Sequence, residues 1–164
     1  MLRNVPVPRW WLLVSAISLG AVALALVSQH VYDMQPCPWC VLQRLIFTAI
    51  GLVAVLGVFW RGAAATWATA LTVGLLASAG MAAALWQHFV AAATASCNQT
   101  LADKIINGLG LDGLLPDVFE PRASCADAAV KLLGLPYEVW SLALFVLIDL
   151  MAAWLLVSRL RRPA

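Results

Sequence analysis

The chain has 164 residues, of which 63% are hydrophobic and only 11% are charged, and its mean hydropathy is +0.91. Water-soluble domains carry about 25% charged residues and 45–50% apolar ones, so this composition excludes an ordinary soluble domain. A net charge of +2 without any long basic run also argues against a nucleic-acid partner. The composition therefore predicts an integral membrane protein that contacts lipid.

Four apolar stretches are long enough to cross a bilayer as helices, which takes about 20 mostly apolar residues each. The first follows Arg3 and Arg9 as a secretory signal would, but it exceeds the 7–15 apolar residues of such a signal, so we expect it to be retained. We predict an all-α membrane protein with a single domain over 1–164, a four-transmembrane-helix bundle. Its spans are expected at about 10–30, 41–60, 63–88 and 138–158, and its outer loops at about 31–40 and 89–137.

The basic residues predict which way the bundle faces. Cytoplasmic loops of membrane proteins are enriched in Lys and Arg. The two outer loops carry more acidic than basic residues, whereas the termini and the connection between spans 2 and 3 carry no acidic residue. Both termini are therefore expected in the cytoplasm. Six basic residues lie on that side: Arg3, Arg9, Arg61, Arg159, Arg161 and Arg162.

The two outer loops differ in size. The first is short and lies near 29–40, whereas the second extends over 91–136. The second is too small and too poor in large apolar residues to build a core of its own. Its segment Leu109–Phe119 mixes leucines with acidic residues, which predicts a short amphipathic helix on the membrane surface.

All four cysteines lie in the predicted outer loops, Cys37 and Cys40 in the first and Cys97 and Cys125 in the second. Cysteines confined to an exported face indicate disulfide chemistry in an oxidising compartment. Four cysteines allow three pairings. The two-residue gap between Cys37 and Cys40 can close a small redox-active ring, which would leave Cys97 with Cys125.

The position of Cys40 favours a reactive thiol. Cys40 immediately precedes span 2, and the dipole and free N–H groups of a helix N-terminus favour thiolate. Arg44 lies four residues further on, so it shares a helix face with Cys40 and can stabilise a thiolate or an anionic acceptor. Two alternatives remain open, a zinc site and a pair of inert structural disulfides. A zinc ribbon usually has two closely spaced cysteine pairs, which Cys97 and Cys125 do not provide.

The chain resembles the disulfide bond formation protein B (DsbB) family, the quinone-dependent thiol oxidases of the bacterial inner membrane. The likeness rests on the four spans, on a cysteine pair in each outer loop, and on the string Gln35-Pro-Cys-Pro-Trp-Cys-Val-Leu-Gln-Arg44, similar to the family's P-C-x-x-C-x-x-x-R. It implies that the short first and long second outer loops are periplasmic. Gln43 departs from the acidic residue found at this position in some members.

The resemblance implies a relay of electrons. A reduced DsbA-like periplasmic protein would form a mixed disulfide with Cys97, the partner of Cys125. Electrons would then pass to the Cys37–Cys40 pair and on to a membrane quinone, either ubiquinone or menaquinone. Arg44 and His88 match family residues associated with quinone binding, and no metal is expected.

Two other classes of function are weighed against this relay. A non-enzymatic four-span scaffold of the tetraspanin type would carry structural disulfides mostly in its large loop. A different membrane redox enzyme, such as a vitamin-K-epoxide-reductase-like protein, would place reactive cysteines inside spans or add helices. The Cys37–Cys40 pair in the short loop favours the thiol oxidase over both.

Overall fold

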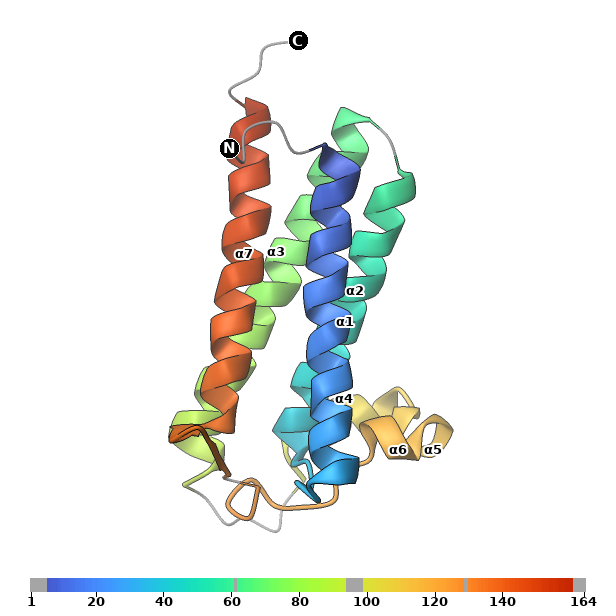
Figure 1. Cartoon of the computed structure of the whole chain (residues 1–164). Helices are drawn as coiled ribbons and strands as arrows, with labels where there is room; N and C mark the ends of the chain where they lie inside the picture. The colour runs from blue at the N-terminus through green and yellow to red at the C-terminus, as the bar shows by residue number, and fades with distance from the viewer. Residues whose placement is uncertain (1–5, 61, 94–98, 129, 161–164) are drawn as a thin grey trace.

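The computed structural model describes residues 6–60, 62–93, 99–128 and 130–160 (Figure 1). Within these residues four helices are long and apolar enough to cross a membrane, which confirms the predicted four-span class. Figure 1 shows that α1 begins and α7 ends at one end of the bundle, while the short helices α4 to α6 lie at the other. The four long helices are α1 (Val7–Val31), α2 (Pro38–Phe59), α3 (Ala63–Trp86) and α7 (Tyr137–Leu160).

Proline and glycine determine where the long helices start. Proline fits the first turn of a helix because the N–H that it lacks would have no partner there. Pro8 lies in the first turn of α1, and Pro38 is the first residue of α2. Gly62 precedes α3 with φ of 128°, a conformation that residues with a Cβ rarely adopt.

The helices pack in pairs. α1 packs along α2 and α7 along α3, α2 joins the two pairs, and α1 and α7 contact each other little. At the centre the rings of Phe47 on α2 and Phe145 on α7 stack with centroids 3.9 Å apart. Gly80 lets α3 approach Phe145, because a Cβ at that position would lie 2.3 Å from the ring. Leucines that are more than half exposed cover the outside of the bundle, as expected for a surface in hydrocarbon: Leu24, Leu52, Leu75 and Leu150.

The second outer loop is folded against the start of α2. α4 (Leu101–Gly108) begins with a capping box in which the Thr100 hydroxyl accepts from the Asp103 N–H and the Asp103 carboxylate accepts from the Thr100 N–H. Ile106 of this helix is fully buried together with Val41 of α2 and Phe119. The loop is therefore anchored to α2 by apolar contacts.

The prediction of one amphipathic helix over Leu109–Phe119 is wrong. The structure has two four-residue helices there, α5 (Leu111–Leu114) and α6 (Pro116–Phe119). Gly110 enters the left-handed region with φ of 64°, and Leu115 is non-helical because the residue before a proline is disfavoured from the helical region.

A two-stranded hairpin, for which the sequence analysis made no prediction, precedes α7. Its strands β1 (Lys131–Leu132) and β2 (Leu135–Pro136) are antiparallel. Leu133 and Gly134 between them both have positive φ, as a two-residue type I′ turn requires. The hairpin leads directly into Tyr137, the first residue of α7.

Candidate redox site

Cys37 and Cys40 lie at the N-terminus of α2. Cys37 is the N-cap residue, and its Sγ accepts a hydrogen bond from the backbone N–H of Cys40 at 3.3 Å. The two Sγ atoms are 2.8 Å apart, both residues are free thiols, and Cys37 is fully buried. Cys40 therefore lies in the first turn of a long helix, where the unpaired N–H groups favour a negative charge.

The backbone of the second loop brings Cys125 to Cys37. The N–H groups of Arg122 and Ala123 donate to the carbonyl oxygen of Pro36, at 2.9 and 3.3 Å. Cys125 consequently packs in the same buried cluster as Cys37. Cys37 thus lies beside Cys40 and in one cluster with the cysteine of the second loop. Cys97, the fourth predicted cysteine, lies outside the described residues.

The thiols of Cys37 and Cys125 differ in pKa because of the hydrogen bonds that they make. The pKa of Cys37 lies well above its ordinary value because of its hydrogen bonds with Cys125 and Cys40, and burial adds to this. The pKa of Cys125 is lowered because the Cys37 thiol donates a hydrogen bond to it. Of these two thiols, Cys37 is therefore the weaker acid.

Two buried glutamines support Cys40. Gln87 donates from Nε2 to the Sγ of Cys40 at 3.2 Å, and Gln43 donates from Nε2 to the Oε1 of Gln87 at 2.7 Å. Gln87 begins η2 (Gln87–Ala91), a π-helical turn that continues α3. Such turns are rare and occur frequently at functional sites. Gln87 could not be predicted from the sequence, because only its place beside His88 distinguishes it there.

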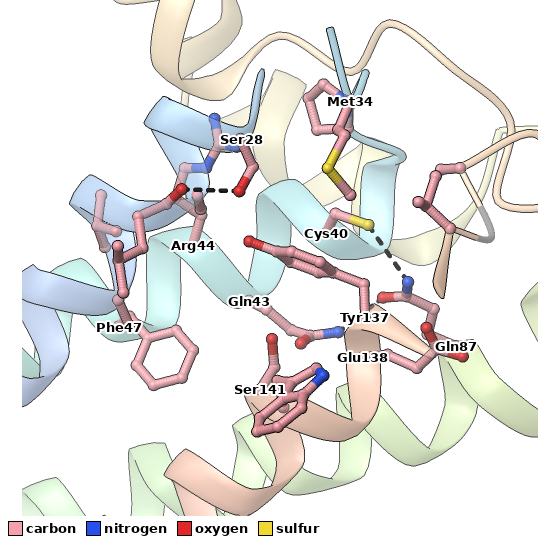
Figure 2. A pocket seen from close by; sticks show the side chains of 18 of the residues that line it. Ser28, Met34, Cys40, Gln43, Arg44, Phe47, Gln87, Tyr137, Glu138 and Ser141 are labelled. Carbon is pink, nitrogen blue, oxygen red and sulfur yellow. Dashed lines mark hydrogen bonds between the residues drawn. The ribbon is translucent and has the colours of Figure 1, made fainter. Parts of the chain in front are cut away.

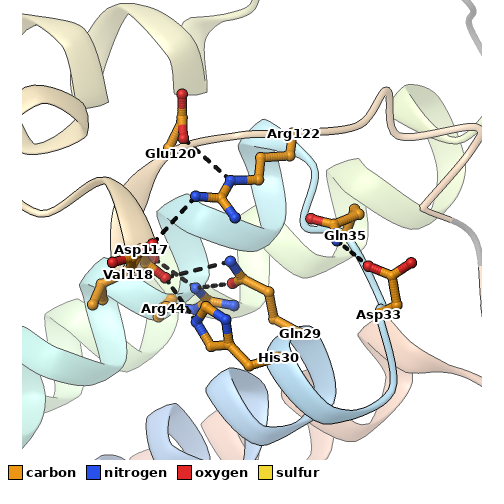
Figure 3. A network of polar contacts seen from close by, with 9 residues as sticks. All are labelled: Gln29, His30, Asp33, Gln35, Arg44, Asp117, Val118, Glu120 and Arg122. Atoms are coloured by element: carbon orange, nitrogen blue, oxygen red, sulfur yellow. Dashed lines mark hydrogen bonds and ion pairs between the residues drawn. The ribbon is translucent and has the colours of Figure 1, made fainter.

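Arg44 connects the start of α2 to the second loop. Its Nη1 donates to Gln29 Oε1 of α1 at 2.8 Å and to the backbone oxygen of Val118 in α6 at 2.6 Å (Figure 3). Gln29 and His30 in turn lie 3.3 Å from the backbone oxygen of Asp117. The Nε of Arg44 is buried and has no hydrogen-bond partner among the described residues, which leaves a donor for a ligand.

A pocket opens beside Cys40 and Arg44, between α1, α2 and α7 (Figure 2). Its cavity volume is about 120 Å³, and a closed apolar cavity of about 150 Å³ is large enough to bind benzene. Because the pocket is also open on one side, it can hold part of a six-membered ring. Apolar side chains line much of it: Ala21, Val22, Leu24, Ala25, Phe47 and Leu144. Polar groups also line it: Cys40, Gln43, Arg44, Gln87, Glu138 and Ser141.

His88 does not line this pocket. Its Nδ1 lies 2.8 Å from Oε1 of Glu138, which does line it, and its side chain is 41% exposed. The structure therefore brings Cys37, Cys40, Cys125 and Arg44 together and links His88 to the pocket through Glu138. Sequence analysis missed Glu138 because its partner lies 50 positions away.

A helical membrane bundle in which a cysteine pair at a helix start adjoins a pocket between spans defines an oxidoreductase of the thiol–disulfide class. The chain belongs to the DsbB family. The family described as "Disulfide bond formation protein DsbB" matches residues 8–155. The chain is accordingly a multi-pass bacterial inner-membrane protein of disulfide bond formation.

Curated relatives cover nearly the whole chain. The Disulfide bond formation protein B of Ralstonia nicotianae is 35% identical over 155 residues, which are 93% of this chain and 96% of that protein. The protein of the same name from Cupriavidus metallidurans is 31% identical, covering 92% of each chain. Disulfide bond formation protein B 1 of Pseudomonas syringae pv. syringae is 32% identical, covering 94% of this chain and 92% of its own.

Proposed function

We propose that this protein oxidises a periplasmic dithiol protein of the DsbA type and passes the electrons through its two cysteine pairs to a membrane quinone. One observation carries the proposal: Cys37 packs in one buried cluster with Cys125, its Sγ lies 2.8 Å from that of Cys40, and Cys40 also lines the pocket. The three sulfurs thus form a continuous path from the second outer loop to a cavity between the spans. A scaffold with structural disulfides would not need such a path.

The distribution of charge supports a periplasmic position for the cysteines. α1 begins and α7 ends at the end of the bundle opposite the cysteines (Figure 1). The segments that precede α1 and that join α2 to α3 carry basic residues and no acidic one. By the positive-inside rule that end faces the cytoplasm.

The thiol geometry supports a particular order of exchange. Cys97 would form the mixed disulfide with the partner, releasing Cys125 as a thiolate. Cys125 would attack Cys37 of the Cys37–Cys40 disulfide, so that a Cys37–Cys125 bond forms and Cys40 leaves as a thiolate. The second thiol of the donor would release Cys97, whose attack on Cys125 would close the loop pair and return Cys37 as a thiol. The place of Cys125 in one buried cluster with Cys37 supports its role as the attacking group.

The residues around the pocket fit a quinone. Its apolar walls suit a flat ring, and the unpartnered Nε of Arg44 can donate to a carbonyl oxygen. A bound quinone would supply a two-electron acceptor. The disulfide/dithiol couple of a DsbA-type protein has a reduction potential of about −120 mV, which lies well above that of the glutathione pool. Glutathione disulfide therefore cannot reoxidise the dithiol, and in the bacterial periplasm the DsbA–DsbB pair uses quinone instead. Arg44 and Gln43 would hold the ring beside Cys40.

The test is quinone reduction by the purified protein, with a reduced DsbA-type protein as electron donor and a short-chain ubiquinone or menaquinone as acceptor. We expect turnover that disappears in Cys40→Ser, whereas Glu120→Gln, a change at the surface of the second loop, retains it. Folded protein that reduces neither quinone would refute the proposal and favour the scaffold.

A further inference from the structure

Glu138 is a buried acid at the pocket, and it contacts a partner that reaches the surface. Its side chain is 7% exposed and lines the pocket beside Cys40 (Figure 2). Its Oε1 lies 2.8 Å from Nδ1 of His88, whose side chain is 41% exposed. Two groups that can each carry a proton therefore connect the cavity with the outer end of the bundle.

A purely structural role accounts for only part of this arrangement. An acidic residue in the first turn of α7 is favoured by the helix dipole, and its contact with His88 ties α7 to η2. Neither effect requires the carboxylate to be buried at a cavity wall, where desolvation is unfavourable. An exposed Glu–His contact would tie the helices equally well.

The proposed reaction requires protons at the pocket, and Glu138 and His88 are placed to supply them. Formation of the Cys37–Cys40 disulfide releases two electrons and two protons, and reduction of a quinone to the quinol consumes two of each. The electrons arrive by thiol–disulfide exchange, which returns Cys37 as a thiol and Cys40 as a thiolate, so one of the two protons is left in the water around the outer loops. That proton must then enter a pocket whose α1 wall carries no titratable side chain.

We propose that His88 and Glu138 form the route by which protons enter the pocket, an inference that rests on the proposed function. The titratable or charged groups around Glu138 are His88 from η2, Cys40 and Arg44 from α2, and Tyr137 beside it on α7. An arginine does not release its proton in proteins, and Cys40 is the electron donor. Carboxyl and imidazole groups are the usual carriers of protons in enzymes. Glu138 gives a proton to the pocket at its carboxyl group, and His88 returns one from solvent.

The test separates proton delivery from thiol exchange. Glu138→Gln keeps the shape of the side chain and its contact with His88 but carries no exchangeable acid proton. Its matched control is Glu120→Gln, because Glu120 is half-exposed and pairs only with Arg122 among the described residues. For each protein we would measure oxidation of the reduced donor in a single turnover without quinone, binding of short-chain ubiquinone, and quinone reduction from pH 5.5 to 8.5.

We expect Glu138→Gln to slow quinone reduction by about 100-fold, the low end of the loss for a missing acid or base, with a steeper pH dependence. Donor oxidation and quinone binding should stay within about twofold of the wild type by the same reasoning. Added imidazole should restore part of the rate to His88→Ala, and Glu138→Asp should keep part of the wild-type rate.

A readout independent of turnover checks the contact itself. The chain has only two histidines, so ¹⁵N NMR of labelled protein resolves both. The Nδ1 resonance of His88 should shift in Glu138→Gln and stay unchanged in Glu120→Gln.

Several results would overturn the proton route. Wild-type quinone reduction in Glu138→Gln would do so, as would an equal loss of donor oxidation and quinone reduction, which indicates a structural role. If Glu138→Gln does not fold, wild-type pH dependence in Glu138→Asp together with no imidazole effect in His88→Ala overturns it instead. Failure of the wild type to reduce any quinone refutes the proposed function, which is a separate outcome.

Discussion

Replacing Arg44 by glutamine tests whether this residue holds the second loop in place as well as facing the pocket. Arg44 donates to Gln29 and to the backbone oxygen of Val118. Of these two bonds only the one to Val118 joins α2 to α6, and a hydrogen bond from a charged group contributes about 1.5–3 kcal/mol. At about 1.4 kcal/mol per factor of ten, the loss of this bond raises the undocked population by about 10-fold to 100-fold.

Hydrogen–deuterium exchange measures this population. The N–H groups of Val118 and Phe119 donate to the backbone oxygen of Leu115, at 3.0 and 2.9 Å. A helix as short as α6 is not stable on its own, so these amides exchange whenever α6 leaves α2. In Arg44→Gln we expect their exchange to speed up by at least about 10-fold.

Arg122→Gln is the matched control, because Arg122 pairs with Asp117 and Glu120 at the surface of the same loop. Exposed pairs contribute at most about 1 kcal/mol, so exchange at Val118 should change less than about fivefold. Unchanged exchange in Arg44→Gln, or equal effects of the two variants, would refute the role of Arg44 in holding α6 against α2. Oxidation of the donor should persist in Arg44→Gln, since the N–H groups that hold the loop to Pro36 remain, while quinone reduction falls.

Two further predictions follow from packing and from the thiols. Gly80→Ala places a Cβ 2.3 Å from the ring of Phe145 and should destabilise the bundle by about 1–3 kcal/mol in a detergent unfolding assay. A Cβ at Gly20 would have no atom within 4 Å, so Gly20→Ala should stabilise the bundle by up to about 1 kcal/mol. Equal melting temperatures of the two variants would contradict this prediction. In the reduced protein, iodoacetamide should modify Cys125 at lower pH than Cys37, because a lowered pKa keeps a thiolate present to lower pH and a raised one delays it. Mass spectrometry across the titration gives the order, and earlier modification of Cys37 would contradict the assigned hydrogen bond.

The spans could be predicted because each depends only on a local run of apolar residues. The pairing of Arg44 with the site could also be predicted, since a separation of four residues on a helix places it on the face of Cys40. The broken helix at 109–119 was predictable in principle. Gly110 and Pro116 both interrupt helices, yet the alternation of leucines and acids was given more weight.

Other parts of the site depend on contacts that leave no pattern in the sequence. Cys125 reaches Cys37 through backbone N–H groups that donate to Pro36, and backbone groups are the same in every residue except proline. The Gln87–Cys40 contact joins residues 47 positions apart in the sequence, and the His88–Glu138 contact joins residues 50 positions apart. Their partners become visible only when the helices are packed.

The π-helical turn at Gln87–Ala91 has a consequence for how α3 can change over evolution. A turn closed by a bond to the fifth residue amounts to one inserted residue, and one residue corresponds to about 100° of rotation in an α-helix. The register before the turn is fixed by the approach of Gly80 to Phe145. The register after it is set by the insertion. Deletion of a single residue in the turn would therefore restore a regular α-helix and rotate the residues at its outer end by about 100° relative to the membrane-embedded part.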